Sequence, residues 1–230
     1  METIYAYLKK ASQELRLLFK QSPPIVALLL VLLTIPLNYA VNSIAIGIFV
    51  VTTLFCIKKS NIRLDRNLLL LAFLFLLMAV SLFWTADFHA SIKALSKELP
   101  LLVFALSFMT FPSFDKTKKQ IVLKYYSIGL CFYLLYFLIR AIIRFSISKD
   151  SGVFFYHELV TEDLNAIHVS VYMALAFFYF YSKKAKSKVD LMVSLLVLIF
   201  IFLLSSKNII IVFIGLIFVF ELFYSKVKLN

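Results

Sequence analysis

The sequence predicts an all-α fold, a polytopic bundle of about eight transmembrane helices with both chain ends in the cytoplasm. Composition is the first observation behind this prediction. Of 230 residues, 63% are hydrophobic and only 16% are charged, whereas soluble domains are about 45–50% apolar and about 25% charged. A core this small cannot hide so much apolar surface, and the apolar residues come in long runs, as membrane spans do.

These runs divide the chain into eight segments, and we expect each to be helical because lipid offers the backbone no other hydrogen-bonding partner. We expect Asn42 in a tight turn, Pro36 to kink the first helix, and Pro100 in the first turn of the fourth. The amphipathic stretch 89–97 is expected to extend that fourth, weakest segment outward. The predicted spans are 24–41, 43–57, 67–84, 98–111, 121–145, 164–181, 189–204 and 208–224.

The N-terminal residues 1–22 are predicted to be a cytoplasmic juxtamembrane segment, and residues 1–230 a single transmembrane domain. The start of the chain loosely resembles a signal peptide, with basic residues before an apolar run. A second apolar run follows at once, however, so an uncleaved first helix is the favoured interpretation.

The basic residues supply the third observation. With the N-terminus inside, most of the 24 Lys and Arg residues fall on the inner side, and with them the whole net charge of +12. This is the positive-inside pattern of inner-membrane proteins, so no nucleic-acid partner is needed to explain the charge. The inner basic loops are predicted to contact anionic membrane lipids. The few outer basic residues are Lys93, Lys97, Arg140, Arg144, Lys149 and Lys207.

Arg140 and Arg144 lie near the outer end of the fifth predicted span, and their spacing places them on one helix face. Like charges at this spacing repel mildly, so a bound anion would stabilise them, and guanidinium groups match phosphate oxygens with paired donors. The structural alternative is that both side chains reach the interface and pair with Glu158, Glu162 or Asp163.

A second candidate anion site is the turn Ser205-Ser206-Lys207-Asn208 between the last two spans. Ser205 or Ser206 can cap the final helix. The free N–H groups of that helix, its positive potential and the charge of Lys207 then form an anion cradle. The alternative is a solvated turn with one lysine.

The third candidate is Asn165, His168 and Tyr172, whose spacing places them on one face at the outer end of the sixth span. His168 is the candidate general base, with Asn165 and Tyr172 in support, and His157-Glu158 of the preceding loop could join them. A histidine that bonds between helices is the alternative. Scattered histidines without ligand cysteines predict no metal site.

Three stretches together resemble the O-antigen ligase and O-antigen polymerase family of bacterial inner-membrane glycosyltransferases. Lys207 stands where many members of the family have arginine. The stretches are residues 81–87 (SLFWTAD) with the following amphipathic segment to 97–100 (KELP), residues 165–172 (NAIHVSVY), and residues 203–207 (LLSSK).

The resemblance implies transfer of a glycan from an undecaprenyl diphosphate carrier to a sugar hydroxyl at the periplasmic face, without a cofactor. The acceptor would be the lipid A core for a ligase, or another repeat unit for a polymerase. Arg140, Arg144, Lys207 and Ser206 would bind the diphosphate. Family members continue into a large external loop with a catalytic histidine, so the resemblance also implies that this chain corresponds to the first part of such a protein.

Two other classes of function stay open at this point. A flippase or transporter would need polar residues near the middle of the membrane and interrupted helices, and few such residues occur. An inactive fragment or assembly subunit would carry the same spans without chemistry.

Overall fold

The computed structural model describes residues 4–37, 39–112, 114–161, 164–183, 187–204 and 207–225. These residues form helices joined by turns, with no β-strand among them. The all-α class predicted from the sequence is therefore confirmed. The chain divides into two compact units, one of residues 1–31 and 40–119 and the other of residues 32–39 and 120–230.

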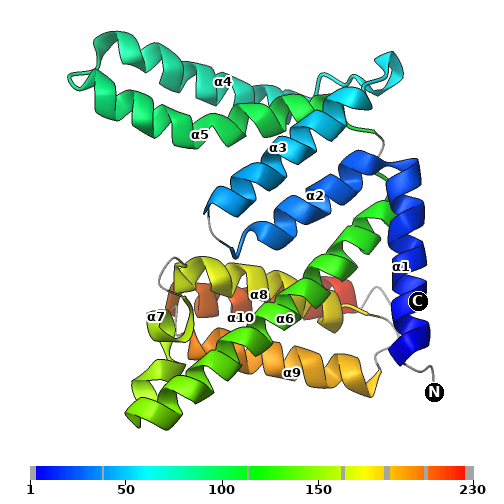
Figure 1. Ribbon diagram of the computed structural model, residues 1–230, viewed down its shortest axis with the longest axis vertical. Coiled ribbons are helices and arrows are strands. Elements are labelled where there is room, and N and C mark those ends of the chain that lie inside the picture. Colours follow the sequence, from blue (N-terminus) through cyan, green and yellow to red (C-terminus); the bar gives the residue numbers. More distant parts are fainter. Residues whose placement is uncertain are drawn as a thin grey trace. The chain divides into compact units, whose positions relative to one another are not determined.

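The first unit begins with α1 (Ile4–Gln21), an amphipathic helix in the predicted juxtamembrane segment. Asn42 Nδ2 of α3 (Tyr39–Phe55) donates to the Val31 carbonyl of α2 (Pro23–Thr34) at 3.1 Å. The helices α4 (Arg66–Val80) and α5 (Phe88–Met109) pack together as a hairpin (Figure 1). Between them lie the 3₁₀ turn Ser81–Trp84 and Asp87, whose carboxylate caps α5 by accepting from Ala90 N.

An aromatic cluster holds α3 to the C-terminal end of α5. The ring of Phe49 is fully buried and lies 5.6–5.9 Å, centroid to centroid, from three phenylalanine rings of α5 and the residues after it. Aromatic pairs at such separations contribute about 0.5–1.5 kcal/mol beyond the area they bury. The three partners of Phe49 are Phe104, Phe108 and Phe111.

The second unit is built on α6 (Lys116–Ser148), α8 (Ala166–Tyr181), α9 (Lys188–Leu203) and α10 (Lys207–Phe220), with a π-helical turn over Glu221–Ser225. The helix α8 packs against α9 and α10. Phe137 of α6 stacks on Phe200 of α9, and Phe177 of α8 meets Phe213 of α10 edge-on at 4.9 Å. Before α8 come the short elements η3 (Ser151–Phe154) and α7 (Tyr156–Leu159) (Figure 1).

Two prolines lie at other positions in their helices than the sequence predicts. The helix α2 ends at Thr34, and Pro36 lies in the following turn, so Pro36 ends the helix instead of kinking it. The residue before a proline is biased away from the α conformation, which explains the early end. Asn42 consequently lies inside α3 and not in a turn. Pro100 lies in the interior of α5, because the predicted extension through residues 89–97 is helical and continuous with the span.

Among the residues that the structure describes, two helical stretches are long and apolar enough to cross a membrane: Arg66–Trp84 and Lys116–Ser148. The helices Pro23–Thr34, Tyr39–Phe55 and Ala166–Tyr181 are apolar but shorter. Of the 18 most apolar residues in a row within Arg66–Trp84, only 6% are buried inside the structure. The large side chains of Leu70, Phe73 and Leu76, spaced along one face of α4, are each more than half exposed.

Candidate functional site

Arg140 and Arg144 lie one turn apart on α6; Arg144 binds Glu158 of α7, and Arg140 binds Val160, the residue after α7. Arg140 Nη1 donates to the Val160 carbonyl at 2.8 Å. Arg144 Nη1 donates to the Glu158 carbonyl at 2.7 Å, and Arg144 Nη2 pairs with the carboxylate of Glu158. The two arginines therefore hold residues 158–160 against the C-terminal end of α6.

The described part of the loop between α6 and α8 contains two non-glycine residues with positive φ, Lys149 (56°) and Tyr156 (52°). Between them Asp150 Oδ1 accepts from Gly152 N at 2.8 Å and caps η3. Leu159 and Val160 are each only 1% exposed. These buried side chains anchor the end of the loop, so the carbonyl groups facing the arginines are in a fixed position.

A polar cavity of about 270 Å³ lies between the arginines and this loop. A guanidinium carries five N–H donors in a planar fork, and the bonds to the loop leave donors on both arginines for a bound anion. The neighbouring imidazole of His157 can donate or accept a proton. The lining residues are Arg140, Arg144, His157, Glu158, Val160, Thr161 and Leu164.

A second cavity, of about 230 Å³, adjoins the first, because Thr161 and Leu164 line both. Its other walls are mostly apolar and aromatic. Tyr133 belongs to this wall, and its hydroxyl donates to the Leu33 carbonyl at the end of α2 at 2.7 Å. A cationic compartment thus opens beside an apolar one. The remaining lining residues are Pro36, Leu37, Tyr136 and Phe137.

The pairing of Arg144 with Glu158, considered in the sequence as the structural alternative, is present. Glu162 and Asp163, the other two acidic partners considered, lie outside the described residues. Arg140 donates to the carbonyl oxygen of Val160. Both arginines therefore bind the loop and also line the cavity. A pairing with Glu158 and a cavity suited to an anion, the two alternatives for this site, occur together.

The side chains of the third candidate site, Asn165, His168 and Tyr172, have other positions than the cavity of the arginines. Asn165 Oδ1 caps α8 by accepting from Ile167 N at 2.9 Å. His168 is exposed in the first turn of α8, and Tyr172 is half-buried. Among the residues described, none of the three lines the polar cavity, whereas His157 does.

Of the predicted turn Ser205-Ser206-Lys207, only Lys207 belongs to the described residues. Lys207 is the first residue of α10 and is exposed, and it does not belong to the described lining of the polar cavity. Ser205 and Ser206 lie outside the described residues. The proposed roles of Lys207 and Ser206 in anion binding stay predictions.

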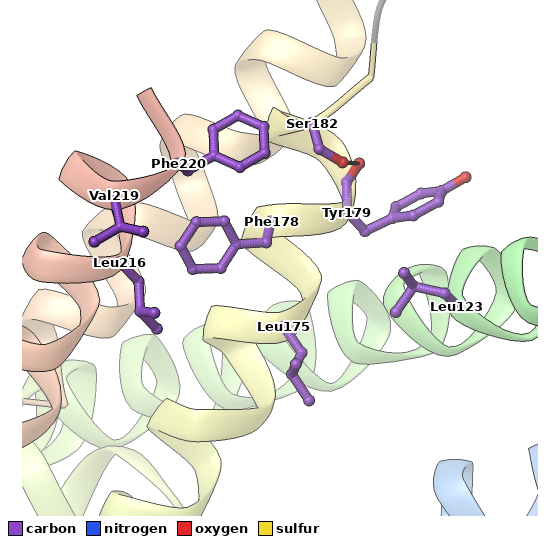
Figure 2. A pocket seen from close by; sticks show the side chains of 8 residues that line it. All are labelled: Leu123, Leu175, Phe178, Tyr179, Ser182, Leu216, Val219 and Phe220. Atoms are coloured by element: carbon purple, nitrogen blue, oxygen red, sulfur yellow. Dashed lines mark hydrogen bonds between the residues drawn. The ribbon is translucent and has the colours of Figure 1, made fainter. Parts of the chain in front are cut away.

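A further cavity of about 390 Å³ lies where α8, α10 and the beginning of α6 approach one another (Figure 2). Its walls are almost entirely apolar, and Ser182 Oγ, on one side of it, donates to the Tyr179 carbonyl at 3.4 Å. This cavity suits an apolar group and lacks the charge of an anion site. The lining residues are Leu123, Leu175, Phe178, Tyr179, Ser182, Leu216, Val219 and Phe220.

Comparisons with protein-family models, with curated proteins and with solved structures find no match for this chain. Within the described part of the chain, no three His, Cys, Asp or Glu side chains lie together as metal ligands would. The chemistry of the site therefore has to be argued from the two arginines, the loop that they hold and the cavities beside them.

Proposed function

We propose that this chain is a polytopic inner-membrane glycosyltransferase of surface polysaccharide assembly, similar to the O-antigen ligases. It transfers a glycan from an undecaprenyl diphosphate carrier to a sugar acceptor such as the lipid A core, at the periplasmic face. The observation that carries the proposal is the cationic cavity of Arg140 and Arg144 beside an aromatic one. That arrangement suits a ligand with an anionic head and an apolar chain.

Exposed apolar surface supports the membrane setting. The side chains of Leu70, Phe73 and Leu76 on α4 are each more than half exposed. Water-soluble proteins rarely expose contiguous apolar patches larger than a few hundred Å². The hydrocarbon core of a bilayer would cover this surface, and the basic residues predicted on the inner side fit the same orientation.

The chemistry of the donor supports a role for the arginines. When the glycosidic bond to the diphosphate breaks, negative charge develops on the leaving diphosphate. Guanidinium donors held in place before the reaction stabilise that charge without reorganising, and their planar forks match phosphate oxygens. The apolar chain of the carrier would run along Tyr136 and Phe137 in the adjoining cavity.

His157 takes the place of His168 as the proposed general base. The acceptor hydroxyl oxygen attacks the anomeric carbon, the bond from that carbon to the diphosphate oxygen breaks, and the diphosphate leaves with the electron pair. The hydroxyl proton passes to the imidazole of His157, which lines the same cavity as both arginines. General bases of this kind contribute about 10²–10⁴-fold to a rate.

A complementation experiment tests the proposal. The chain is expressed in cells that lack their own copy, and surface polysaccharide is measured by gel and by mass spectrometry of the lipid-linked product. Substituting Arg140, Arg144 and Lys207 together by Gln is expected to abolish glycan transfer. The matched control is the pair Lys93→Gln and Lys97→Gln, which removes charge on the same predicted side but outside the cavity.

Two results would count against the proposal. Normal polysaccharide in the triple variant would remove the arginines and Lys207 from the mechanism. Equal loss in the control pair would mean that general charge on the outer side matters, and not the cavity. The chain-length distribution of the product separates ligation, which attaches a finished glycan, from polymerisation, which lengthens it.

A further inference from the structure

The turn that joins α4 to α5 exposes a cluster of aromatic side chains. Phe83 is 88% exposed, Trp84 is 72% exposed, and Phe88, which begins α5, is 58% exposed. The turn forms the tip of the α4–α5 hairpin (Figure 1). Large apolar surfaces that stay uncovered within a fold mark sites of contact with another protein or with a membrane.

The exposed rings belong to a turn that is itself well bonded. Ser81 Oγ donates to the Met78 carbonyl at 2.7 Å, just before the rings. Just after them, the hydroxyl groups of Thr85 and Ser91 share a hydrogen bond of 2.7 Å, which ties the turn to the first turn of α5. The folded turn therefore presents Trp84 outward, because hydrogen bonds on both sides of it fix the backbone.

Two rows of exposed side chains continue from the tip along the first three turns of α5. Residues four apart lie on one face of a helix, so the spacing within each row gives it a face of its own, one basic and one apolar. The basic row is His89, Lys93 and Lys97, and the apolar row is Phe88, Ile92 and Leu99. This end of the hairpin thus has an apolar side and a basic side.

Neither water nor hydrocarbon suits both sides of the hairpin tip. Water would leave Phe83 and Trp84 uncovered, whereas the hydrocarbon core would surround Lys93 with lipid chains at a high cost. The boundary between head groups and acyl chains satisfies both sides, as it does for amphipathic helices with aromatic and basic faces. A tryptophan ring suits this level, being apolar with one polar N–H, and a long lysine side chain can reach back to the head groups.

We propose that Phe83, Trp84 and Phe88 form a lipid anchor, which inserts where the head groups meet the acyl chains. The basic row of α5 is turned towards the head groups and water. The partner of this surface is a lipid surface, because a basic row lies beside the aromatic cluster. The anchor shares the membrane setting of the proposed function but takes part in no step of glycan transfer.

Trp84 is the only tryptophan of the chain, so tryptophan fluorescence of the unmodified protein reports on the tip alone. The full chain is reconstituted in phospholipid vesicles whose acyl chains carry bromine near the carbonyl end or near the methyl end, and iodide is added in the water. We expect the strongest quenching from bromine near the carbonyl end and weak quenching by iodide. Strong iodide quenching without bromine quenching would place the tip in water. Protection from both quenchers would mean that a protein surface, such as a second copy, covers it. Strongest quenching from the methyl end would place it in the hydrocarbon core. Each of these three results would overturn the inference.

A matched pair of variants tests the role of the apolar cluster. Phe83→Asp is expected to shift the Trp84 emission to longer wavelength and to strengthen iodide quenching, since a carboxylate disfavours an apolar environment. Ser96→Asp, at an exposed residue in α5, adds the same charge away from the tip and is expected to change neither. No shift in Phe83→Asp, or equal shifts in both variants, would overturn the inference, and the unmodified protein still decides it if Phe83→Asp does not fold. An inserted tip without glycan transfer in cells would reject the proposed function alone.

Discussion

Arg140 and Arg144 carry the same charge but differ in what holds them. Arg144 has both a carbonyl and a carboxylate partner in the loop, whereas Arg140 donates to the Val160 carbonyl and lies next to the aromatic cavity. In the proposed function, Arg140 serves as an anchor for the anionic group of the donor. Its value there depends on the fork geometry of the guanidinium as well as on its charge.

Replacing Arg140 by Lys separates these two contributions. Arg140→Lys keeps the charge but loses the paired donors and the bond to the Val160 carbonyl. Charged hydrogen bonds contribute about 1.5–3 kcal/mol, so we expect glycan transfer in cell membranes to fall about tenfold or more. The matched control is Arg63→Lys, the same exchange at an exposed residue on the predicted inner side. Unchanged transfer in Arg140→Lys would show that charge alone is sufficient at this position.

Part of this site can be predicted from the sequence. The spacing of Arg140 and Arg144 predicts a shared helix face, and both do face one loop. It could not predict the contact of Arg144 with Glu158, because the loop contains Lys149 and Tyr156 in a backbone conformation unusual for residues other than glycine. The sequence also could not indicate that His157, and not His168, lines the cavity, since the position of His157 depends on that same loop.

At the scale of helices, α6 contacts the end of α2 through a residue without a side chain. A Cβ atom added to Gly129 would lie 2.2 Å from Leu33 Cδ2, far inside van der Waals contact. One turn further along α6, Tyr133 donates its hydroxyl to the Leu33 carbonyl, which lacks a partner within α2 because the helix ends there. Gly129 permits the close approach, and Tyr133 fixes its register.

Enlarging this glycine should loosen the contact. Gly129→Val is expected to lower the free energy of unfolding by about 1–3 kcal/mol, as overpacking does, read as a lower midpoint of thermal unfolding in detergent. Gly215→Val in α10 is the control, since a Cβ there meets nothing within 4 Å. Adding Leu33→Ala to Gly129→Val should recover part of the loss. Equal effects of Gly129→Val and Gly215→Val would mean that helix propensity, and not the contact with Leu33, is responsible.

Helix positions were predicted more accurately than helix ends. The apolar runs place α4, α6, α8 and α9 to within a few residues, because the length of an apolar run can be counted in the sequence. The ends depend on local chemistry that competes with it: Pro36 ends α2 early, and the cap at Asp87 starts α5 before its apolar part. Pro100 is accommodated within α5, so a proline alone does not fix a boundary.

At the scale of the whole molecule, the length of α6 sets a geometric condition. Its 33 residues extend over about 50 Å at 1.5 Å per residue, compared with about 30 Å for the hydrocarbon core of a bilayer. In the proposed membrane setting, the helix would therefore tilt or reach beyond the core. Lysines stand at its first turns and the two arginines near its last, so either solution places charges at both interfaces and apolar residues between them.

This condition leads to a test of the orientation on which the proposed chemistry depends. The two cysteines, Cys56 and Cys131, are free and can both be replaced by Ser. Single cysteines at Lys59, Lys149 and Lys207 are then labelled in intact cells with a membrane-impermeant maleimide. The positive-inside pattern predicts labelling at positions 149 and 207 from outside, and at position 59 only after the membrane is opened. Labelling in the reverse order would place Arg144 in the cytoplasm, away from a periplasmic glycan donor, and the role proposed for its cavity would have to be abandoned.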